Sequence, residues 1–595
     1  MNRHPSATFL LPSLILSRKG SDMCRMKLVM AAAIAAVAVQ LLCVHSANAA
    51  TSTSAVAIPT TAAADDAAPK PPIRRVLPDD AAPRTALVVQ DNVAMRAAAK
   101  DSSPAQAQLW RGEALEIRGE RPDHFQVYDY RRERGGFVRK AALLPLNGLA
   151  AQPEALLAAL RVVRQQPGAE SLGLGLAAAY VQAAGAAQMN GVDGAEALDA
   201  MGTLAERLAD RASRTQSRSD GVATVAPTAA ETQVAAQLEV AARYGLRFRT
   251  LEREAGAMQL CYDGEAFRRV LAMSASTPEQ KARAALALTR ADCLDPVATP
   301  PQREQMDQWR ADVLDKVDLR DPALATHWRN RVLMRQSGVW SSLAFIRARR
   351  ASAASGAGTA GPTGAAGMAS ATAAPVALQV DASSAAARRA LEAFARVVPA
   401  ELSDDDQPTY NDAAMRGNAM RWAALSTAAP EQALGAVKLG VAPGQPGETC
   451  LTLTLNGAKE GNAPLLRHCA WGLVMTASAR INREGTAIAI ASVPADGWRE
   501  LWLLRRSAQG WKVSVLPPVA AQPGLGYAEF AGWVPGGKEL LVARESRAEG
   551  RYKRSYELVD LDTLETKRQA GDVTMLGAFQ RWQAADWKGT SLSAR

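Results

Sequence analysis

The sequence predicts a multidomain α+β protein, because strand-like and helix-like patterns follow one another along a chain of 595 residues. Residues 84–146 alternate short apolar runs with polar turns, which is the pattern of a small β unit. Residues 150–350 instead repeat apolar side chains at helical spacing. Residues 449–595 return to alternating runs typical of an antiparallel sheet. These changes of pattern also give the expected domain boundaries.

Residues 1–49 have the order of a secretory signal peptide. Arg25 and Lys27 precede an apolar run, and a small-residue site with Ala47 and Ala49 follows it. The run reaches only about 17 residues, the lower limit for a bilayer span. We therefore expect cleavage after Ala49, a periplasmic mature protein, and no stable membrane span after cleavage.

The charge of the mature chain is only mildly basic. Cleavage removes five basic residues and one acidic residue, which lowers the formal charge from +10 to +6. A balance of this size without a Lys/Arg block indicates a solvated surface, and we expect no nucleic-acid partner. Residues 50–83 are rich in Ala, Thr, Pro and Asp without an apolar period, so they are expected to form a disordered tether.

The four cysteines that remain after cleavage fall into two local pairs, Cys261 with Cys293 and Cys450 with Cys469. An even number of cysteines in an exported chain indicates disulfides. Local pairing is favoured because cross-pairing would have to bridge the low-complexity linker at 351–378. The chain lacks the C-x-x-C spacing of a zinc site, so no metal is expected.

The β unit at 84–146 carries four short motifs in a fixed order. They are residues 92–96 (NVAMR), 111–117 (RGEALEI), 124–127 (HFQV) and 136–139 (GFVR). In this order they resemble the bacterial SH3 family (SH3b), although Ala94 and Met95 separate Val93 from Arg96, and Phe125 stands where the family usually has Trp. The resemblance implies a small β-barrel that binds peptide through an aromatic-lined groove.

The candidate ligand-binding residues of this unit are aromatic or basic. Strand alternation places Phe125 on one face and Tyr128 with Tyr130 on the other. We therefore expect Phe125 and Phe137 to fill the barrel core, and the tyrosines with their neighbouring arginines to contact a ligand. The full candidate set is Trp110, Tyr128, Tyr130, Arg131 and Arg132.

The middle region, residues 150–350, predicts an array of helices. Leu156, Leu157 and Leu160 share one face of the first, and Pro153 lies near its start. The expected successors are 173–188, 194–212, 230–256, 263–274, 278–292, 301–316 and 322–350. Paired helices of this length resemble tetratricopeptide-like solenoids, although the W-x-x-L-G consensus is missing. Cys261 and Cys293 would then clip together one helical hairpin.

Residues 379–448 are expected to form a helix, over 383–398, followed by an irregular connector. The domain at 449–595 contains two similar stretches, 479–492 and 531–544, each leading to another apolar strand. Both resemble the WD40-like blades of periplasmic propellers of the TolB type. At most three blades fit this length, whereas a propeller needs about four to eight. Three interpretations remain: an open propeller fragment, a propeller completed by segments assigned here as helical, and simple β-meanders. We favour the first or the third.

The sequence offers no catalytic or cofactor constellation. After cleavage only His124, His327 and His468 remain, none spaced as metal ligands, and neither H-E-x-x-H nor G-x-S-x-G occurs. We expect a non-catalytic binding or scaffold protein without a cofactor, whose SH3-like domain docks cell-wall peptide or an envelope protein partner. The alternative is a cell-wall hydrolase, or a regulator of one, targeted by the SH3-like domain.

Overall fold

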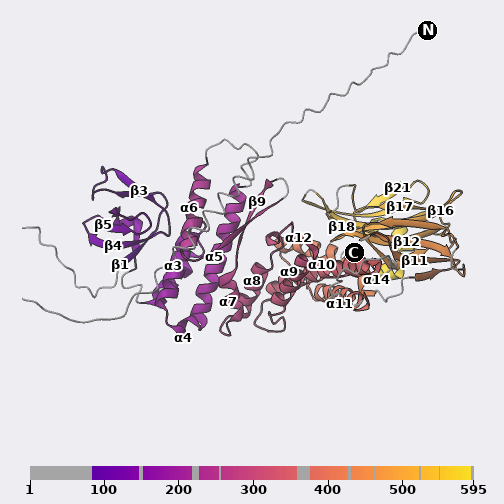
Figure 1. The fold of residues 1–595 in the computed structure, drawn as a ribbon, viewed down its shortest axis with the longest axis horizontal. Coiled ribbons are helices and arrows are strands. Elements are labelled where there is room, and N and C mark those ends of the chain that lie inside the picture. The colour runs from indigo at the N-terminus through magenta and orange to yellow at the C-terminus, as the bar shows by residue number, and fades with distance from the viewer. Residues whose placement is uncertain are drawn as a thin grey trace, which may run out of the picture. The chain divides into compact units, whose positions relative to one another are not determined.

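The computed structural model describes residues 84–146, 152–216, 227–253, 256–357, 376–425, 431–445, 447–459, 462–520, 524–548 and 550–590. The predicted signal peptide, with Ala47 and Ala49, and the predicted tether at 50–83 lie outside these residues. Helices and antiparallel sheets both occur, which confirms the predicted α+β composition (Figure 1). None of the helices in the described residues combines the length and the apolar character needed to cross a bilayer.

The N-terminal β unit is a seven-stranded antiparallel sheet in the order β3-β2-β6-β5-β4-β1-β7. Its strands are β1 (Arg84–Val88), β2 (Val93–Arg96), β3 (Ala105–Leu109), β4 (Ala114–Glu120), β5 (His124–Asp129), β6 (Arg134–Arg139) and β7 (Leu143–Pro145). Alternate side chains such as Val88, Leu115 and Val138 form its core. Phe125 is buried there, as predicted. The prediction for Phe137 is wrong: it is only half-buried and lies outside this core, because its neighbour Val138 occupies the inward position of β6.

Hydrogen bonds connect the β unit to the helices that follow it. The Tyr244 hydroxyl donates to the Gly112 carbonyl over 2.6 Å, and the Ser171 hydroxyl donates to the Arg111 carbonyl over 2.8 Å. Gly112 has φ +86°, and a Cβ there would lie 2.4 Å from the Ser171 carbonyl oxygen. Only glycine fits this approach. The turn between β3 and β4 is therefore held against the helical region.

The helical region contains nine α-helices within the described residues. They are α2 (Pro153–Val163), α3 (Glu170–Ala183), α4 (Ala186–Met189), α5 (Val192–Gln216), α6 (Ala229–Arg243), α7 (Glu265–Ala272), α8 (Pro278–Leu288), α9 (Pro300–Leu314) and α10 (Thr326–Ala357). Threonine capping boxes start α6, α8 and α9, where Thr228 pairs with Glu231, Thr277 with Gln280 and Thr299 with Gln302. Leucines facing inward from α2, α3 and α5 form a shared core.

The prediction of one helix over 230–256 is wrong. Helix α6 ends at Arg243, and Gly245 takes a left-handed conformation with φ +81°. A hairpin of β8 (Phe248–Glu252) and β9 (Met258–Tyr262) follows, labelled in Figure 1 by its second strand. The sequence pattern did not reveal this hairpin because its strands are short and helical patterns precede and follow it.

The first disulfide therefore has a different setting from the one predicted. Cys261 pairs with Cys293, as expected, with their Cα atoms 5.8 Å apart. Cys261 lies in strand β9, however, and Cys293 lies in a 3-10 turn, η3 (Ala291–Cys293), that follows α8. The bridge joins a strand to a turn, and the predicted clipped helical hairpin is wrong.

Helices occupy more of the region before the C-terminal domain than the sequence predicted. Helix α10 continues to Ala357, and α11 (Val376–Ala395) starts within the predicted linker. Residues 379–448, expected to hold one helix and a connector, also contain α12 (Gln407–Met420) and the strands β10 (Glu431–Leu434) and β11 (Val437–Pro443). Helix α12 has no simple apolar stripe because Ala413 through Met415 and Gly417 through Met420 are all buried.

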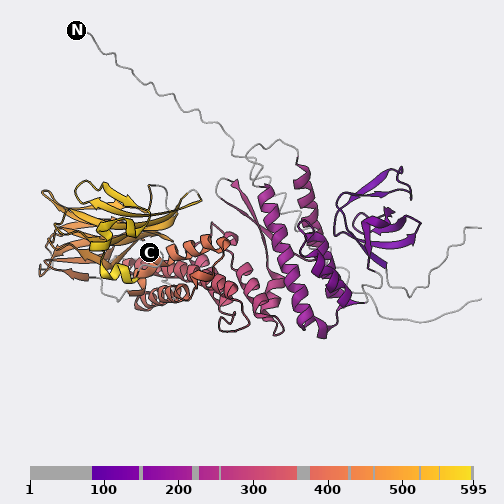
Figure 2. The same cartoon turned by 180° about the vertical axis from the view of Figure 1, so that it is seen from behind.

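The C-terminal strands form two sheets. One has the order β10-β11-β12-β13, and the other has the order β14-β15-β16-β18-β19-β20-β21, with β17 paired to β16. The further bounds are β12 (Thr449–Leu455), β13 (Leu466–Ala470), β14 (Leu473–Ile481), β15 (Ala487–Ala495), β16 (Trp498–Ser507), β17 (Gly510–Leu516), β18 (Leu525–Trp533), β19 (Glu539–Ala548), β20 (Arg551–Asp560) and β21 (Thr566–Ala570). Figure 2 shows these strands in orange to yellow.

The two sheets share a core. Leu439 and Leu453 of the smaller sheet belong to the same apolar cluster as Ile490 and Leu504 of the larger one. A second cluster joins the larger sheet to α12 and to two short helices, α13 (Gly577–Trp582) and α14 (Ala585–Thr590). Strands from different parts of the sequence are therefore fixed by both sheet and helix packing.

The two similar sequence stretches occupy equivalent positions in the larger sheet. Residues 479–492 span the turn from β14 to β15, and residues 531–544 span the turn from β18 to β19. A register shift occurs in both hairpins, at Met475/Arg480 and at Phe530/Gly532. Strands β16 and β18 then pair in parallel and join the two antiparallel meanders.

Candidate functional site

Four side chains on the outer face of the β unit form what we call the outer-face cluster: Glu116, Arg118, Tyr128 and Tyr130. The two tyrosine rings meet edge to face with centroids 5.1 Å apart. The Arg118 guanidinium lies 3.7 Å from the centre of the Tyr128 ring and 5.9 Å from that of Tyr130. Tyr130 is 67% exposed. The cluster therefore presents an aromatic and cationic surface to solvent.

Antiparallel pairing of β4 with β5 places these residues together. Glu116 stands opposite Tyr128 in the register, and its carboxylate accepts hydrogen bonds from the Tyr130 hydroxyl (2.8 Å) and from Arg118 Nε (3.0 Å). Burial opposes the charge of Arg118, but the hydrogen bonds to Glu116 and Tyr130 raise its pKa above the ordinary value. The guanidinium is thus held in one orientation with its charge retained.

The structure does not bring the predicted Arg131 and Arg132 into this cluster. Arg132 donates to Glu113 over 3.0 Å and also pairs with Asp129, within the β unit itself. Arg131 pairs with Glu239 of helix α6. Both arginines therefore serve contacts inside the molecule, and Arg131 helps to connect the β unit to the helices.

Trp110 is half-buried in the turn between β3 and β4, apart from the tyrosines. Sequence reasoning found Tyr128 and Tyr130 but missed Glu116 and Arg118. The available signal was their two-residue spacing on β4, which places both on the outward face next to the tyrosines.

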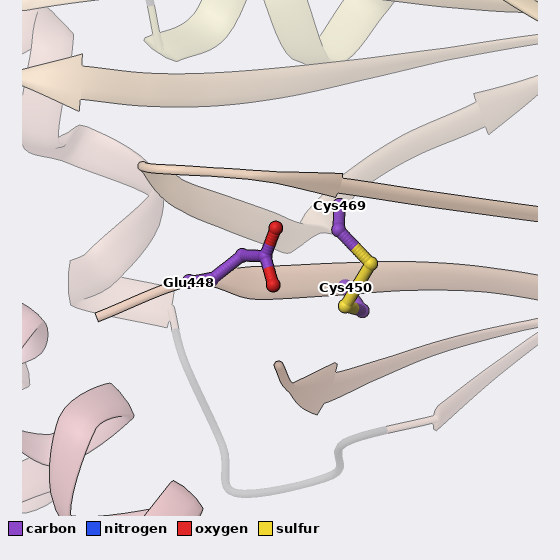
Figure 3. A group of neighbouring side chains, drawn as sticks. All are labelled: Glu448, Cys450 and Cys469. Carbon is purple, nitrogen blue, oxygen red and sulfur yellow. A yellow bond between two sulfur atoms is a disulfide. The ribbon is translucent and has the colours of Figure 1, made fainter. Parts of the chain in front are cut away.

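Glu448, Cys450 and Cys469 lie close enough together to resemble a metal site, but the two cysteines form the second disulfide. Cys450 and Cys469 face each other across β12 and β13, and Glu448 lies close to them. Figure 3 shows that the two sulfur atoms are bonded to each other. The thiolate is the form of cysteine that binds metals, so this group does not form a metal centre while the disulfide is intact.

The three described histidines lie in separate surroundings. His124 Nε2 is 3.8 Å from an Asp101 carboxylate oxygen, the His327 ring packs on Trp328, and the His468 ring meets Trp502 edge to face. No two of these histidines contact each other. Their contacts are ring packing and, for His124, one long contact with a carboxylate.

No protein-family model, curated protein or solved structure matches this chain.

Proposed function

We propose that this protein is a non-catalytic periplasmic binding or scaffold protein whose β unit is an SH3-like barrel that docks cell-wall peptide. The observation that carries the proposal is the outer-face cluster, in which an exposed tyrosine, a partly exposed tyrosine and a fixed guanidinium lie next to a carboxylate. Aromatic residues and arginine are the side chains that contribute most at binding surfaces. The order of the four strand motifs and the seven antiparallel strands support the SH3-like assignment.

The charges of the cluster favour a peptide with charges of both signs. Arg118 can pair with a carboxylate of the ligand, while Glu116 can accept from an amine. The stem peptides of the bacterial cell wall carry free carboxylates and an amine. Tyr128 and Tyr130 offer flat apolar surface between these charges, since Tyr130 is exposed and Tyr128 is partly so.

Export supports the same assignment. The signal-peptide pattern precedes the described residues, and the four cysteines of the mature chain form two local pairs. We also propose that the two meanders of the C-terminal sheet are propeller-like blades in an incomplete set. They would act, with the helices, as the scaffold that presents the β unit.

A cosedimentation assay with purified cell-wall sacculi tests the proposal. The protein without residues 1–49 is compared with a Tyr128→Ala/Tyr130→Ala variant and with Gln126→Ala as a matched control. Gln126 is an exposed residue on the same outer face of β5. We expect the double variant to lose at least about tenfold in affinity, and the control to stay within about twofold.

Circular dichroism and thermal melting establish that all three proteins are folded. Equal binding by the folded double variant and the wild type would contradict the proposal. A zymogram with the same sacculi separates the alternative, because a clearing zone would identify a cell-wall hydrolase.

A further inference from the structure

A cavity of about 230 Å³ lies among helices α9, α10 and α12, away from the outer-face cluster. Four arginines line it: Arg303, Arg310, Arg335 and Arg416. They come from three helices, and polar side chains of Ser342 and Thr409 complete part of the wall. A cavity of this size has room for a small ion with a few water molecules.

Two of the arginines are fixed by the end of another helix. Arg310 is 4% exposed, and its guanidinium donates twice to the Thr289 carbonyl, over 3.1 and 2.7 Å. Arg335 donates to the same carbonyl over 2.5 Å. Thr289 is the C-cap of α8, where the helix carries a partial negative charge. The helix end orients both guanidinium groups but supplies only part of a counter-charge.

The carboxylates bonded to the lining arginines carry less negative charge than the arginines carry positive charge. Arg303 and Arg310 share a single carboxylate, Asp307, over 2.8 and 2.6 Å. Arg416 pairs with Asp496 over 3.3 Å. Four guanidinium groups therefore have two carboxylates as direct partners.

The other acidic groups nearby are engaged elsewhere. Asp412 lines the cavity and pairs with Arg547, which does not line it, and the charge of Arg416 also acts on the Asp412 carboxylate. Asp292 and Glu206 attract Arg335 at longer range, and both are bonded to Arg290. In the described part of the chain, Arg335 has no carboxylate within ion-pair distance, and its hydrogen bonds go to main-chain carbonyls.

The pKa shifts of two lining arginines agree with an excess of positive charge. Burial lowers the pKa of Arg335 to about 10, and the charge of Arg310 acts in the same direction. Burial also lowers the pKa of Arg310, with further repulsion from Arg303 and Arg416. The guanidinium groups are thus close enough to repel one another, and an anion among them would relieve the repulsion.

We propose that this cavity is a binding site for a phosphate-class oxyanion, either inorganic phosphate or the phosphoryl group of a small molecule. A doubly charged anion matches the excess of two charges that the four guanidinium groups have over their two directly bonded carboxylates. Its tetrahedral oxygens can accept from several guanidinium groups at once, which is the geometry that arginine favours. The site is independent of the peptide-binding proposal, since it shares no residue with the outer-face cluster.

Isothermal titration of the mature protein with inorganic phosphate at constant ionic strength tests the site, with sodium chloride as the reference titration. We expect saturable binding at one phosphate per chain. Arg416→Gln and Arg335→Gln should each lower the affinity at least about tenfold, because each removes a charged donor. Arg320→Gln is the matched control, since Arg320 is an exposed arginine of the same region outside the cavity.

A phosphate monoester such as glycerol phosphate provides the second arm. Tighter binding of the monoester assigns the site to a phosphorylated molecule, and tighter or equal binding of inorganic phosphate assigns it to the free ion. Absence of saturable binding by the wild type, or equal loss in Arg320→Gln, would overturn the proposal.

Some of these variants disturb the contacts of α8, so a variant that unfolds needs a substitute. Arg303→Gln leaves Arg310 paired with Asp307 and provides the second test of affinity. Phosphate bound by the wild type should broaden the phosphorus NMR signal of phosphate. Equal broadening by folded Arg303→Gln and Arg416→Gln would also contradict the proposal.

Discussion

The N-terminal β unit and the larger C-terminal sheet use the same three side-chain types in opposite ways. In the β unit, Arg118 lies over Tyr128 and bonds Glu116 on a face open to solvent. In the larger sheet, Arg499 lies 5.1 Å from the centre of the Tyr527 ring and pairs with Glu529. All three of those residues are buried.

Helix packing makes the difference between the two trios. Arg499 donates to the Asn418 carbonyl of α12, and Glu529 also pairs with Arg421 of the 3-10 helix η6 (Arg421–Leu425). The buried trio therefore joins the helices to the sheet, whereas the trio of the β unit lies on a solvent-facing surface.

The largest effect is expected from a substitution that breaks the buried trio. Glu529→Ala leaves Arg421 and Arg499 without their shared carboxylate in a buried place, and we expect a loss of about 3–5 kcal/mol in the free energy of unfolding. Glu116→Ala, the same change in the exposed trio, should cost at most about 1 kcal/mol. Urea unfolding of both variants measures the contrast, and equal losses would contradict it.

The next prediction compares the two faces of strand β5. Phe125→Ala removes a ring from the core of the β unit and should cost about 3–4 kcal/mol. Tyr130→Ala removes an exposed ring on the opposite face and should change stability by at most about 0.5 kcal/mol. Hydrogen exchange of the β5 amides checks both values within this unit. Similar protection in the two variants would argue against the assigned faces.

Removal of the second disulfide should affect only one of the two regions. Residues 84–146 contain no cysteine, whereas Cys450 and Cys469 bridge β12 and β13 with a separation of 19 residues. The chain-entropy model gives about 3 kcal/mol for a loop of this length. We expect Cys450→Ser/Cys469→Ser to speed amide exchange in β12 and to leave β5 unchanged. Faster exchange in β5 would show that the regions are coupled.

The smallest expected effect is a loss of folding stability at low pH. A hydrogen bond from Lys567 and two backbone N–H groups of the β20–β21 turn lower the pKa of Asp560, and Arg139 lowers that of Asp101 in the β unit. Both folded-state pKa values lie below the unfolded ones, so their stabilisation is full above the ordinary carboxyl pKa and is lost as pH falls further. Between pH 7 and pH 3 the free energy of unfolding of the wild type should decrease. Asp560→Asn should make this decrease smaller by more than Asp101→Asn does. Chemical denaturation at pH 7 and pH 3 checks the order.

Local sequence patterns predicted several features that the structure contains. The alternation around Phe125 and Tyr130 assigned them to opposite faces of β5, because successive side chains of a strand point to opposite sides. The spacing of the cysteines predicted both pairs. The short hairpin after α6 and the buried helix α12 were missed, since one is too short and the other too uniformly buried to give a clear period.

By itself, the sequence determined the α+β composition, the inward and outward faces of β5 and the cysteine partners, since each depends on neighbours within a few residues or on a small set of candidates. Only the tertiary structure decided that Arg132 and Arg131 form internal ion pairs, that Arg118 joins the tyrosines, and that four arginines from three helices line one cavity. These placements depend on strand pairing and helix packing over long separations, which periodicity along the chain does not encode.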